Sequence, residues 1–277
     1  MSRSGILGSV LMTLASAVLA ATGLPPHLGP AGQDEYRDYQ EAPDHRAFAI
    51  APGGAWGWAA GKSTAEAAEE EALAICQGQT EQRCVSYAVD ARTVFDAANW
   101  PRLWRPYASA AQAKQAPVGR KRGQRMHDLA YVDSRGKPAR LSAQRGKVVV
   151  LHFWGAWCPP CRREMPDMQK TYERLNKRGD FAFVILQARE RSEVSRQWAD
   201  KQGIVLPLAD SGSIGEEDAH FRLADGTKIR DRDVANRFPT TYVIDRNGVV
   251  VFSHVGPIHD WSQYDDFLMN LAGQQRY

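Results

Sequence analysis

The sequence is short of cysteine and of net charge, and both shortages exclude classes of function. Its 277 residues include four cysteines and carry a formal net charge of +3. A nucleic-acid-binding domain is usually far more basic, with its positive charge clustered on one surface. A zinc site built on a CxxC motif needs a second ligand pair, and the sequence contains one CxxC and no HxxxH. We therefore expect no nucleic-acid partner, no metal and no cofactor.

A long uncharged run stands at the start of the chain, where no charged residue occurs between Arg3 and Leu24. The small residues around Val18-Leu19-Ala20 suit cleavage by a signal peptidase, so we expect residues 1–22 to be a signal peptide. The alternative is an uncleaved membrane anchor, because a membrane span needs about 20 apolar residues. Both alternatives predict an exported protein in an oxidising compartment, most simply the periplasm.

The next part of the chain divides into a tether and a small domain. Residues 23–45 combine prolines, glycines and mixed charges with few apolar side chains, which favours a tether. Residues 46–97 then show the pattern of a small α+β domain. Its expected elements are strands at 48–50 and 56–59, a helix capped by Ser63 with Glu66 completing a capping box, and a strand from Cys84.

Cys76 and Cys84 are expected to form a structural disulfide in this small domain. About 50 residues bury too little surface to be stable unaided. The alternative is a free pair with a catalytic role, although the spacing is not CxxC. The segment resembles a small domain of unknown function from secreted bacterial proteins, on the Gly-Trp-Ala strand at 57–59 and the Ala-Leu-x-x-Cys helix end at 72–76. That resemblance implies no chemistry.

Residues 98–126 are expected to be a linker. Their Ala/Gln/Lys stretch and the cluster Arg120-Lys121-Arg122 are typical of solvated, flexible chain. A second possibility for the cluster is contact with anionic lipid or an acidic partner. Trp100 and Trp104 are candidates to dock on a neighbouring surface.

Residues 127–277 alternate strand and helix patterns. The expected elements are a hairpin at 129–141, a strand at 148–154, a helix at 162–178, a strand at 181–186, a helix at 190–202, a short extended segment at 206–208, a hairpin at 241–252 and a helix at 261–271. A crossover between parallel strands followed by a hairpin predicts a mixed sheet.

The motif Trp157-Cys158-Pro159-Pro160-Cys161 lies where a buried strand passes into a helix. The free N–H groups and positive end of a helix favour a thiolate over a thiol. Thiol–disulfide exchange needs an attacking thiolate and a second thiol within reach. We therefore expect Cys158 to be the exposed nucleophile and Cys161, one turn into the helix, to be the shielded resolving cysteine.

The order of elements, the Trp-Cys-x-x-Cys motif and the segment 238–248 (FPTTYVIDRNG) resemble the thioredoxin superfamily. Within it, the chain resembles the exported TlpA/ResA-like thiol–disulfide oxidoreductases. The resemblance implies a thioredoxin-like, three-layer α/β/α fold with a mixed sheet over residues 127–277, preceded here by the small disulfide-stapled α+β domain.

The same resemblance assigns roles to residues around the cysteines. It implies that Pro239 is the cis-proline facing the disulfide, with Phe238, Thr240 and Trp157 as substrate-binding residues. Glu164 occupies a position that is often acidic in this family, where it would relay a proton to or from Cys161. The alternative for Glu164 is a carboxylate that only favours the helix N-terminus.

Two features depart from the family pattern. His152 stands where relatives carry Asp or Asn, and it is either a proton relay or a satisfied core histidine. Residues 210–237 are longer than the family minimum, and we expect them near the rim of the site, as a substrate-choosing insert or a decorative loop.

The functional hypothesis is a periplasmic enzyme that reduces disulfides in protein substrates, such as an apocytochrome or a copper-site protein, and receives electrons from a membrane donor. Pro159 and Pro160 have no N–H to stabilise the Cys158 thiolate, which disfavours a strongly oxidising disulfide. The alternatives are a disulfide oxidase or isomerase, and a non-catalytic envelope adaptor that uses the fold as a platform.

Overall fold

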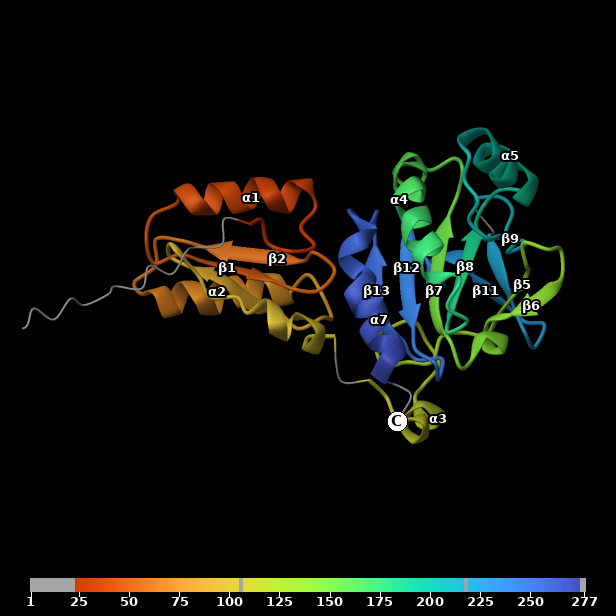
Figure 1. The fold of residues 1–277 in the computed structure, drawn as a ribbon, viewed down its shortest axis with the longest axis horizontal. Coiled ribbons are helices and arrows are strands. Elements are labelled where there is room, and N and C mark those ends of the chain that lie inside the picture. The colour runs from red at the N-terminus through yellow and green to blue at the C-terminus, as the bar shows by residue number, and fades with distance from the viewer. Residues whose placement is uncertain (1–22, 105–106, 217–218, 275–277) are drawn as a thin grey trace, which may run out of the picture.

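The computed structural model describes residues 23–104, 107–216 and 219–274. The predicted signal peptide or anchor at 1–22 lies outside the described residues. Within the described ranges no helix is long and apolar enough to cross a membrane. Figure 1 shows two bodies along the chain, a small one built from the N-terminal elements and a larger one built around a central sheet.

The small body, which we call the N-terminal module (residues 23–97), is a four-stranded antiparallel sheet between two helices (Figure 1). The strand order is β2-β1-β3-β4. The elements are α1 (Pro30–Glu41), β1 (Ala47–Ile50), β2 (Trp56–Ala59), α2 (Ala65–Gln77), β3 (Val85–Val89) and β4 (Arg92–Thr93). Successive β1 side chains point to opposite faces, so Ala47 and Ala49 pack in one core cluster with α2, and Phe48 and Ile50 in another with α1.

The tether predicted for residues 23–45 is wrong, because most of this segment is the helix α1. Tyr36 and Tyr39 are buried on one side of α1, with the Tyr36 ring 5.0 Å from the Phe48 ring. Two tyrosines three residues apart form a narrow apolar stripe among charged neighbours, which average composition conceals. The helix cap predicted at Ser63 is also shifted, since Thr64 is the N-cap and its hydroxyl accepts from the Ala67 N–H.

The segment predicted as a flexible linker, 98–126, is ordered over its described residues. It contains η1 (Ala97–Arg102) and α3 (Ala110–Gln115). Trp104 is 1% exposed and stacks on Phe267 with ring centroids 3.7 Å apart. The Arg122 guanidinium donates to the Trp104 carbonyl, so this residue of the basic cluster is held against the fold. The expected docking of Trp104 is confirmed, and the burial of its indole explains why the segment is ordered.

The larger body contains a five-stranded mixed sheet in the order β13-β12-β7-β8-β9. Strands β7, β8 and β9 are parallel, and β12 runs antiparallel to both β7 and β13. The elements are β7 (Val148–Trp154), α4 (Pro159–Leu175), β8 (Phe181–Gln187), α5 (Ser192–Gln202), β9 (Leu208–Ala209), β12 (Thr240–Ile244), β13 (Val250–Val255), η3 (Trp261–Tyr264) and α7 (Asp265–Gln274). The mixed sheet and its closing hairpin are as predicted.

A second four-stranded sheet covers the face of the central sheet opposite α4 and α7. Its order is β11-β10-β5-β6, from β5 (Leu129–Val132), β6 (Pro138–Arg140), β10 (His220–Leu223) and β11 (Lys228–Arg230), with η2 (Leu141–Gln144) and α6 (Asp231–Val234) beside it. The three-layer arrangement is confirmed with one difference, that this outer layer is mainly strand. The insert at 210–237 supplies β10, β11 and α6, and is therefore part of the core.

Candidate functional site

The redox motif follows β7, whose seven residues are all buried. Helix α4 begins at Pro159, three residues earlier than predicted, because prolines in a first turn cost no backbone hydrogen bond. Cys158 is therefore the N-cap of α4, and its N–H donates to the Gly155 carbonyl at 3.0 Å. The structure places Cys158 at the helix start, as the sequence predicts.

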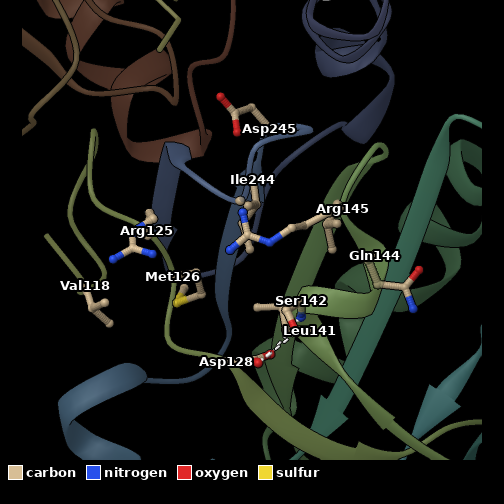
Figure 2. Close-up of a pocket in the computed structure, with 12 residues that line it drawn as sticks. Val118, Arg125, Met126, Asp128, Leu141, Ser142, Gln144, Arg145, Ile244 and Asp245 are labelled. Carbon is tan, nitrogen blue, oxygen red and sulfur yellow. Dashed lines mark hydrogen bonds between the residues drawn. The ribbon is translucent and has the colours of Figure 1, made fainter. Parts of the chain in front are cut away.

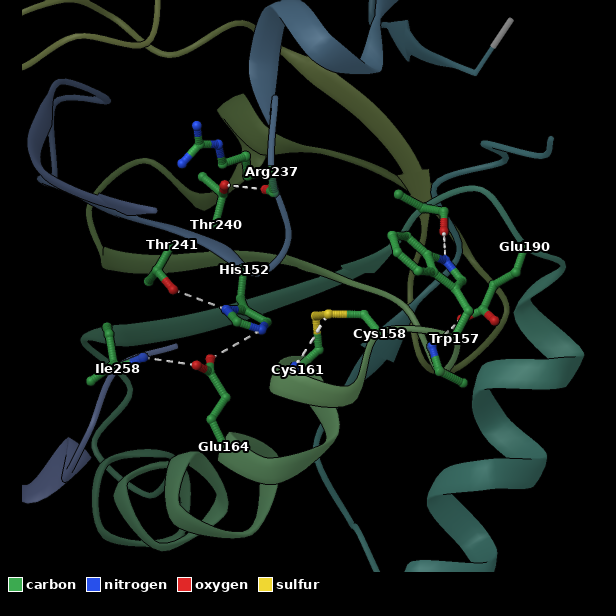
Figure 3. The surroundings of a disulfide bond; sticks show 12 residues. His152, Trp157, Cys158, Cys161, Glu164, Glu190, Arg237, Thr240, Thr241 and Ile258 are labelled. Carbon is green, nitrogen blue, oxygen red and sulfur yellow. Dashed lines mark hydrogen bonds and ion pairs between the residues drawn. A yellow bond between two sulfur atoms is a disulfide. The ribbon is translucent and has the colours of Figure 1, made fainter. Parts of the chain in front are cut away.

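Cys158 and Cys161 form a disulfide, and the Cys161 N–H lies 3.3 Å from the Cys158 sulfur (Figure 3). Although Pro159 and Pro160 have no N–H to offer, the Cys161 N–H is a donor to the Cys158 sulfur. It belongs to the first turn of α4, so it adds to the field that favours a thiolate once the disulfide opens. Cys158 is 3% exposed and Cys161 is fully buried. The expectation of an exposed Cys158 is therefore wrong in this oxidised state, although Cys158 is the more accessible of the two.

His152 and Glu164, predicted as separate proton relays, lie together beside the disulfide (Figure 3). His152 Nε2 is 3.4 Å from Glu164 Oε1, and both side chains are buried. The other ring nitrogen, Nδ1, is 2.9 Å from the Thr241 hydroxyl. The second carboxyl oxygen of Glu164 accepts from the Ile258 N–H at 2.8 Å. Two titratable groups thus share one buried contact, one helical turn from Cys161.

Burial sets the charge of this pair. It raises the pKa of Glu164 well above its ordinary value and lowers the pKa of His152 to about 3. Burial therefore favours the neutral form of both groups, with the proton on the carboxyl group. A protonated carboxyl can donate to the unprotonated imidazole nitrogen, which satisfies two atoms that otherwise have no hydrogen-bond partner among the described residues. The arrangement can hold one proton one helical turn from Cys161.

The Phe238–Pro239 peptide bond is cis, as the resemblance implies, and the Pro239 carbonyl accepts from the Gly256 N–H at 2.9 Å. Phe238 is half-buried and meets Trp157 edge-on, with ring centroids 5.3 Å apart. Trp157 is 44% exposed and donates to the Ala188 carbonyl. Trp157 and Phe238 therefore form an aromatic surface beside the disulfide.

Thr240 does not belong to that surface. It is 1% exposed, and its hydroxyl donates to the Arg237 carbonyl at 2.6 Å (Figure 3). The buried, bonded hydroxyl cannot itself contact a substrate, so the substrate-binding role of Thr240 stays a prediction that only its main chain could serve. Its contact instead holds the loop that carries Phe238 and Pro239.

Two further residues support the site and were missed in the sequence. The Glu190 carboxylate accepts from the Ala156 N–H and the Ser195 hydroxyl, both at 2.6 Å, and so fixes the loop before Cys158. Arg189 pairs with Asp231 of α6 at 2.5 Å and lies over the Phe238 ring at 5.0 Å. The Arg189 contacts place one end of the insert next to the aromatic surface, as expected. Neither residue belongs to a local motif, so only the fold reveals them.

A cavity of about 230 Å³ lies at the other end of the central sheet, near the start of β7 and the end of β12 (Figure 2). Its charged side chains are engaged by the fold itself. Arg125 donates to the Ala116 carbonyl, Arg145 to the Asn247 carbonyl, and Asp128 accepts from Ser142. We assign no chemistry to it. Among the described residues no group of three or more His, Cys, Asp or Glu side chains could hold a metal ion.

Comparison with known proteins agrees with this geometry. The family model Redoxin matches residues 116–268. The chain belongs to the Redoxin family. It is 31% identical to the thioredoxin-like protein YneN of Bacillus subtilis over 50% of this chain and 74% of that protein. It is 29% identical to the thiol-disulfide oxidoreductase ResA of Bacillus anthracis over 48% of this chain and 69% of that protein.

A solved structure, a putative thiol:disulfide interchange protein DsbE from Chlorobium tepidum, is 25% identical and matches with a TM-score of 0.44, covering 55% of this chain and 99% of that one. The identification as a TlpA/ResA-like member of the thioredoxin superfamily, and as a thiol–disulfide oxidoreductase, is confirmed by the family and the named relatives. The Redoxin match begins after the N-terminal module. The resemblance of that module to a secreted domain of unknown function stays a prediction.

Proposed function

We propose that this Redoxin-family protein is exported to the periplasm and reduces disulfides in protein substrates through Cys158 and Cys161. The observation that carries the proposal is the disulfide at the start of α4, with the Cys161 N–H at the Cys158 sulfur and the Trp157–Phe238 surface beside it. A disulfide that can open at a helix N-terminus is suited to exchange, and an exposed aromatic ring is suited to contact a protein partner.

The reaction would proceed in two exchanges. The Cys158 thiolate attacks one sulfur of the substrate disulfide, and the other substrate sulfur leaves as a thiolate that takes a proton. The Cys161 thiol then loses its proton and attacks Cys158 in the mixed disulfide, which releases the second substrate thiol. Two electrons pass to the substrate, and the enzyme is left with the disulfide seen in the structure. A membrane electron donor would return the pair to the dithiol.

Glu164 and His152 would serve the second exchange. Cys161 must lose a proton in a buried environment, where a charged product is costly. The carboxyl of Glu164 lies one turn further along the same helix and is paired with His152 at 3.4 Å. The carboxyl can give its proton to the first departing substrate thiolate, and the carboxylate that remains can then take up the proton of Cys161.

The reducing direction is supported by the donors around Cys158. The Cys161 N–H is the one backbone donor that the structure places at its sulfur among the described residues, since Pro159 and Pro160 have none. Few donors mean a less stabilised thiolate, and a less stabilised thiolate means a less oxidising disulfide.

Equilibration of the purified protein with glutathione or dithiothreitol buffers tests this direction. We expect a reduction potential nearer to the roughly −270 mV of thioredoxin than to the roughly −120 mV of the strong oxidant DsbA. A value near −120 mV would show an oxidase. An insulin-reduction assay with Cys158→Ser as control tests catalysis itself, and equal rates for both proteins would show an adaptor.

A further inference from the structure

Strand β13 forms one end of the five-stranded sheet, so one of its sides has no neighbouring strand in that sheet. In an antiparallel pair, the backbone groups of successive residues point alternately toward the partner and away from it. The direction at Val250 is known, because its N–H donates to the Gln124 carbonyl and its carbonyl accepts from the Gly123 N–H, both at 2.8 Å. The backbone N–H and carbonyl of Val250 therefore point away from β12.

A bulge then shifts the alternation. The register passes from Ile244 opposite Val250 to Val243 opposite Phe252, which leaves Val251 as an extra residue. Beyond the bulge, Phe252 and His254 direct their backbone groups to β12, and Ser253 and Val255 direct theirs outward. The bond from the Gly256 N–H to the Pro239 carbonyl fits this alternation.

The two halves of this outer edge differ in what covers them. The half at Val249–Val251 is paired with residues 123–125, and the Gln82 side chain of the N-terminal module donates to the Val251 carbonyl at 3.4 Å. In the outer half, no backbone hydrogen bond links Ser253 or Val255 to any other described segment outside the sheet. Proteins usually cover or block such edges, so an edge that is open over one half calls for an explanation.

A cleft of about 570 Å³ lies along the open half. One wall is β13 at 252–255, and the other is two loops of the N-terminal module at 52–55 and 78–81. Gly53 lets the loop of the module approach β13 closely, because a Cβ on Gly53 would lie 2.7 Å from the Phe252 ring. Val255 is 45% exposed in this wall. The cleft thus offers unpaired backbone groups and an apolar side chain between two bodies of the protein.

This cleft adjoins the redox site. Val255 pairs with Thr240, which follows Pro239, and Gly256 is bonded to Pro239 itself. A strand paired with the open side of β13 would lie three strand spacings from β7, about 14 Å, and an extended chain advances about 3.3 Å per residue. A polypeptide whose disulfide lies at Cys158 would therefore reach the open edge about four residues further along its chain.

We propose that Ser253–Val255 is a docking edge that pairs with the extended segment flanking the disulfide of a protein substrate. This inference rests on the proposed reducing function and adds to it how the substrate is held. Backbone pairing gives affinity with little dependence on the partner's sequence, which suits an enzyme that acts on unfolded or partly folded chains. The N-terminal module then forms the second wall of the substrate cleft.

The test compares Ser253→Pro with the matched control Ser253→Ala. Proline removes the outward N–H and leaves the bonds between β13 and β12 in place, so the fold tolerates it at this edge position. Each protein is assayed on insulin and on a small disulfide, 5,5′-dithiobis(2-nitrobenzoate). We expect the KM for insulin to rise about fivefold in Ser253→Pro alone, from the loss of one backbone hydrogen bond. Rates on the small disulfide should not change.

Equal KM values for insulin in Ser253→Pro, Ser253→Ala and the wild type would overturn the docking edge. If Ser253→Pro also loses rate on the small disulfide, the test moves to Val255→Pro, which removes the next outward N–H. A rise in the ratio of the KM for insulin to the KM for the small disulfide would then support the docking edge, and an unchanged ratio would overturn it. The affinity of the reduced insulin B chain for Cys158→Ser, measured with and without Ser253→Pro, tests binding to the edge in the absence of turnover. It therefore separates failure of the edge from failure of the reducing function. A wild-type dimer that Ser253→Pro converts to monomer would assign the edge to a second copy and overturn the proposal.

Discussion

The two disulfides of this chain differ in what surrounds them rather than in how deeply they are buried. All four cysteines are at most 9% exposed. The Cys76–Cys84 bridge joins the end of α2 to the residue before β3 and lies in a cluster dominated by alanines such as Ala68 and Ala72. The Cys158–Cys161 bridge lies at the start of a helix, with a backbone donor at one sulfur and the His152–Glu164 pair nearby.

This comparison shows how to separate a structural bridge from a redox bridge when both are buried. Among the described residues, the one polar contact of the Cys76 sulfur is the Ala55 carbonyl at 3.8 Å, which cannot stabilise a thiolate. Near Cys158 there are a helix N-terminus, the buried His152–Glu164 pair and an exposed aromatic ring. The first environment favours the closed bridge, and the second allows both states.

The largest expected effect is the loss of exchange when the redox bridge is removed. Cys158→Ser should reduce insulin no faster than buffer, because the attacking thiolate is gone. Cys161→Ser should instead trap a mixed disulfide through Cys158, visible by mass spectrometry. A trapped adduct in Cys158→Ser would reverse the two assigned roles.

The next effect concerns stability and comes from the other bridge. The double variant Cys76→Ser with Cys84→Ser should lower the free energy of opening of the N-terminal module by about 2.5 kcal/mol, the loop entropy expected for a short bridged loop. Hydrogen exchange of amides in α2 and β3 of the full chain measures this. Rates on a small disulfide should stay at the wild-type level. A fall in those rates would give the bridge a part in the chemistry and remove the contrast between the two bridges.

A smaller effect is expected from the His152–Glu164 pair. Glu164→Gln keeps the shape of the side chain and removes its ionisation. Release of substrate from the mixed disulfide should slow about tenfold near neutral pH, less than the roughly hundredfold typical of a group that acts directly as general acid or base. Rapid-quench measurement of that step provides the check, and His152→Asn serves as a partner variant. An unchanged rate and pH profile in Glu164→Gln would leave the carboxyl as a structural acceptor for Ile258.

The same pair gives a signed dependence of stability on pH. Because the pKa of Glu164 is raised in the folded state, the folded protein keeps a proton that the unfolded chain releases above the ordinary value of 4.5. Stability should therefore fall as pH rises from 4.5 toward the raised pKa, and Glu164→Gln should remove that fall. The pKa of His152 is lowered from 6.5 to about 3, so its effect is opposite, and stability is lost as pH falls through that window. Between pH 4.5 and 6.5 the two slopes oppose each other, so denaturant unfolding of the wild type gives their sum, and Glu164→Gln isolates the His152 slope.

The sequence was sufficient to predict those elements that a local residue pattern determines. The apolar strand before Cys158, the hairpin around 241–252 and the Cys76–Cys84 bridge were all predicted. Helix α1 was missed because two tyrosines supply most of its buried surface, so composition over 23–45 resembled a tether. The insert was missed as core because β10 and β11 are three or four residues long, too short to show a period.

Contacts between distant segments account for the rest of the site. His152 and Glu164 were each singled out, but their pairing depends on the packing of α4 against β7. Glu190 and Arg189 act on groups 34 and 42 residues away, respectively, in the sequence. The burial of the Thr240 side chain was not foreseen, because motif position does not reveal which way a strand side chain faces. One sequence without relatives gives no signal for such pairs.

The smallest expected effect separates the surroundings of the two bridges by their exposed apolar side chains. Trp157 beside Cys158 and Ile75 beside Cys76 are 44% and 40% exposed. Trp157→Ala should raise the KM for insulin about threefold, because an exposed ring next to the reactive sulfur is a contact for a protein partner. Ile75→Ala should leave the KM unchanged, and neither variant should alter rates on a small disulfide. A comparable rise in both variants would mean that substrate contacts the face of the module around Ile75 as well, and would extend the binding surface from the redox bridge to the structural one.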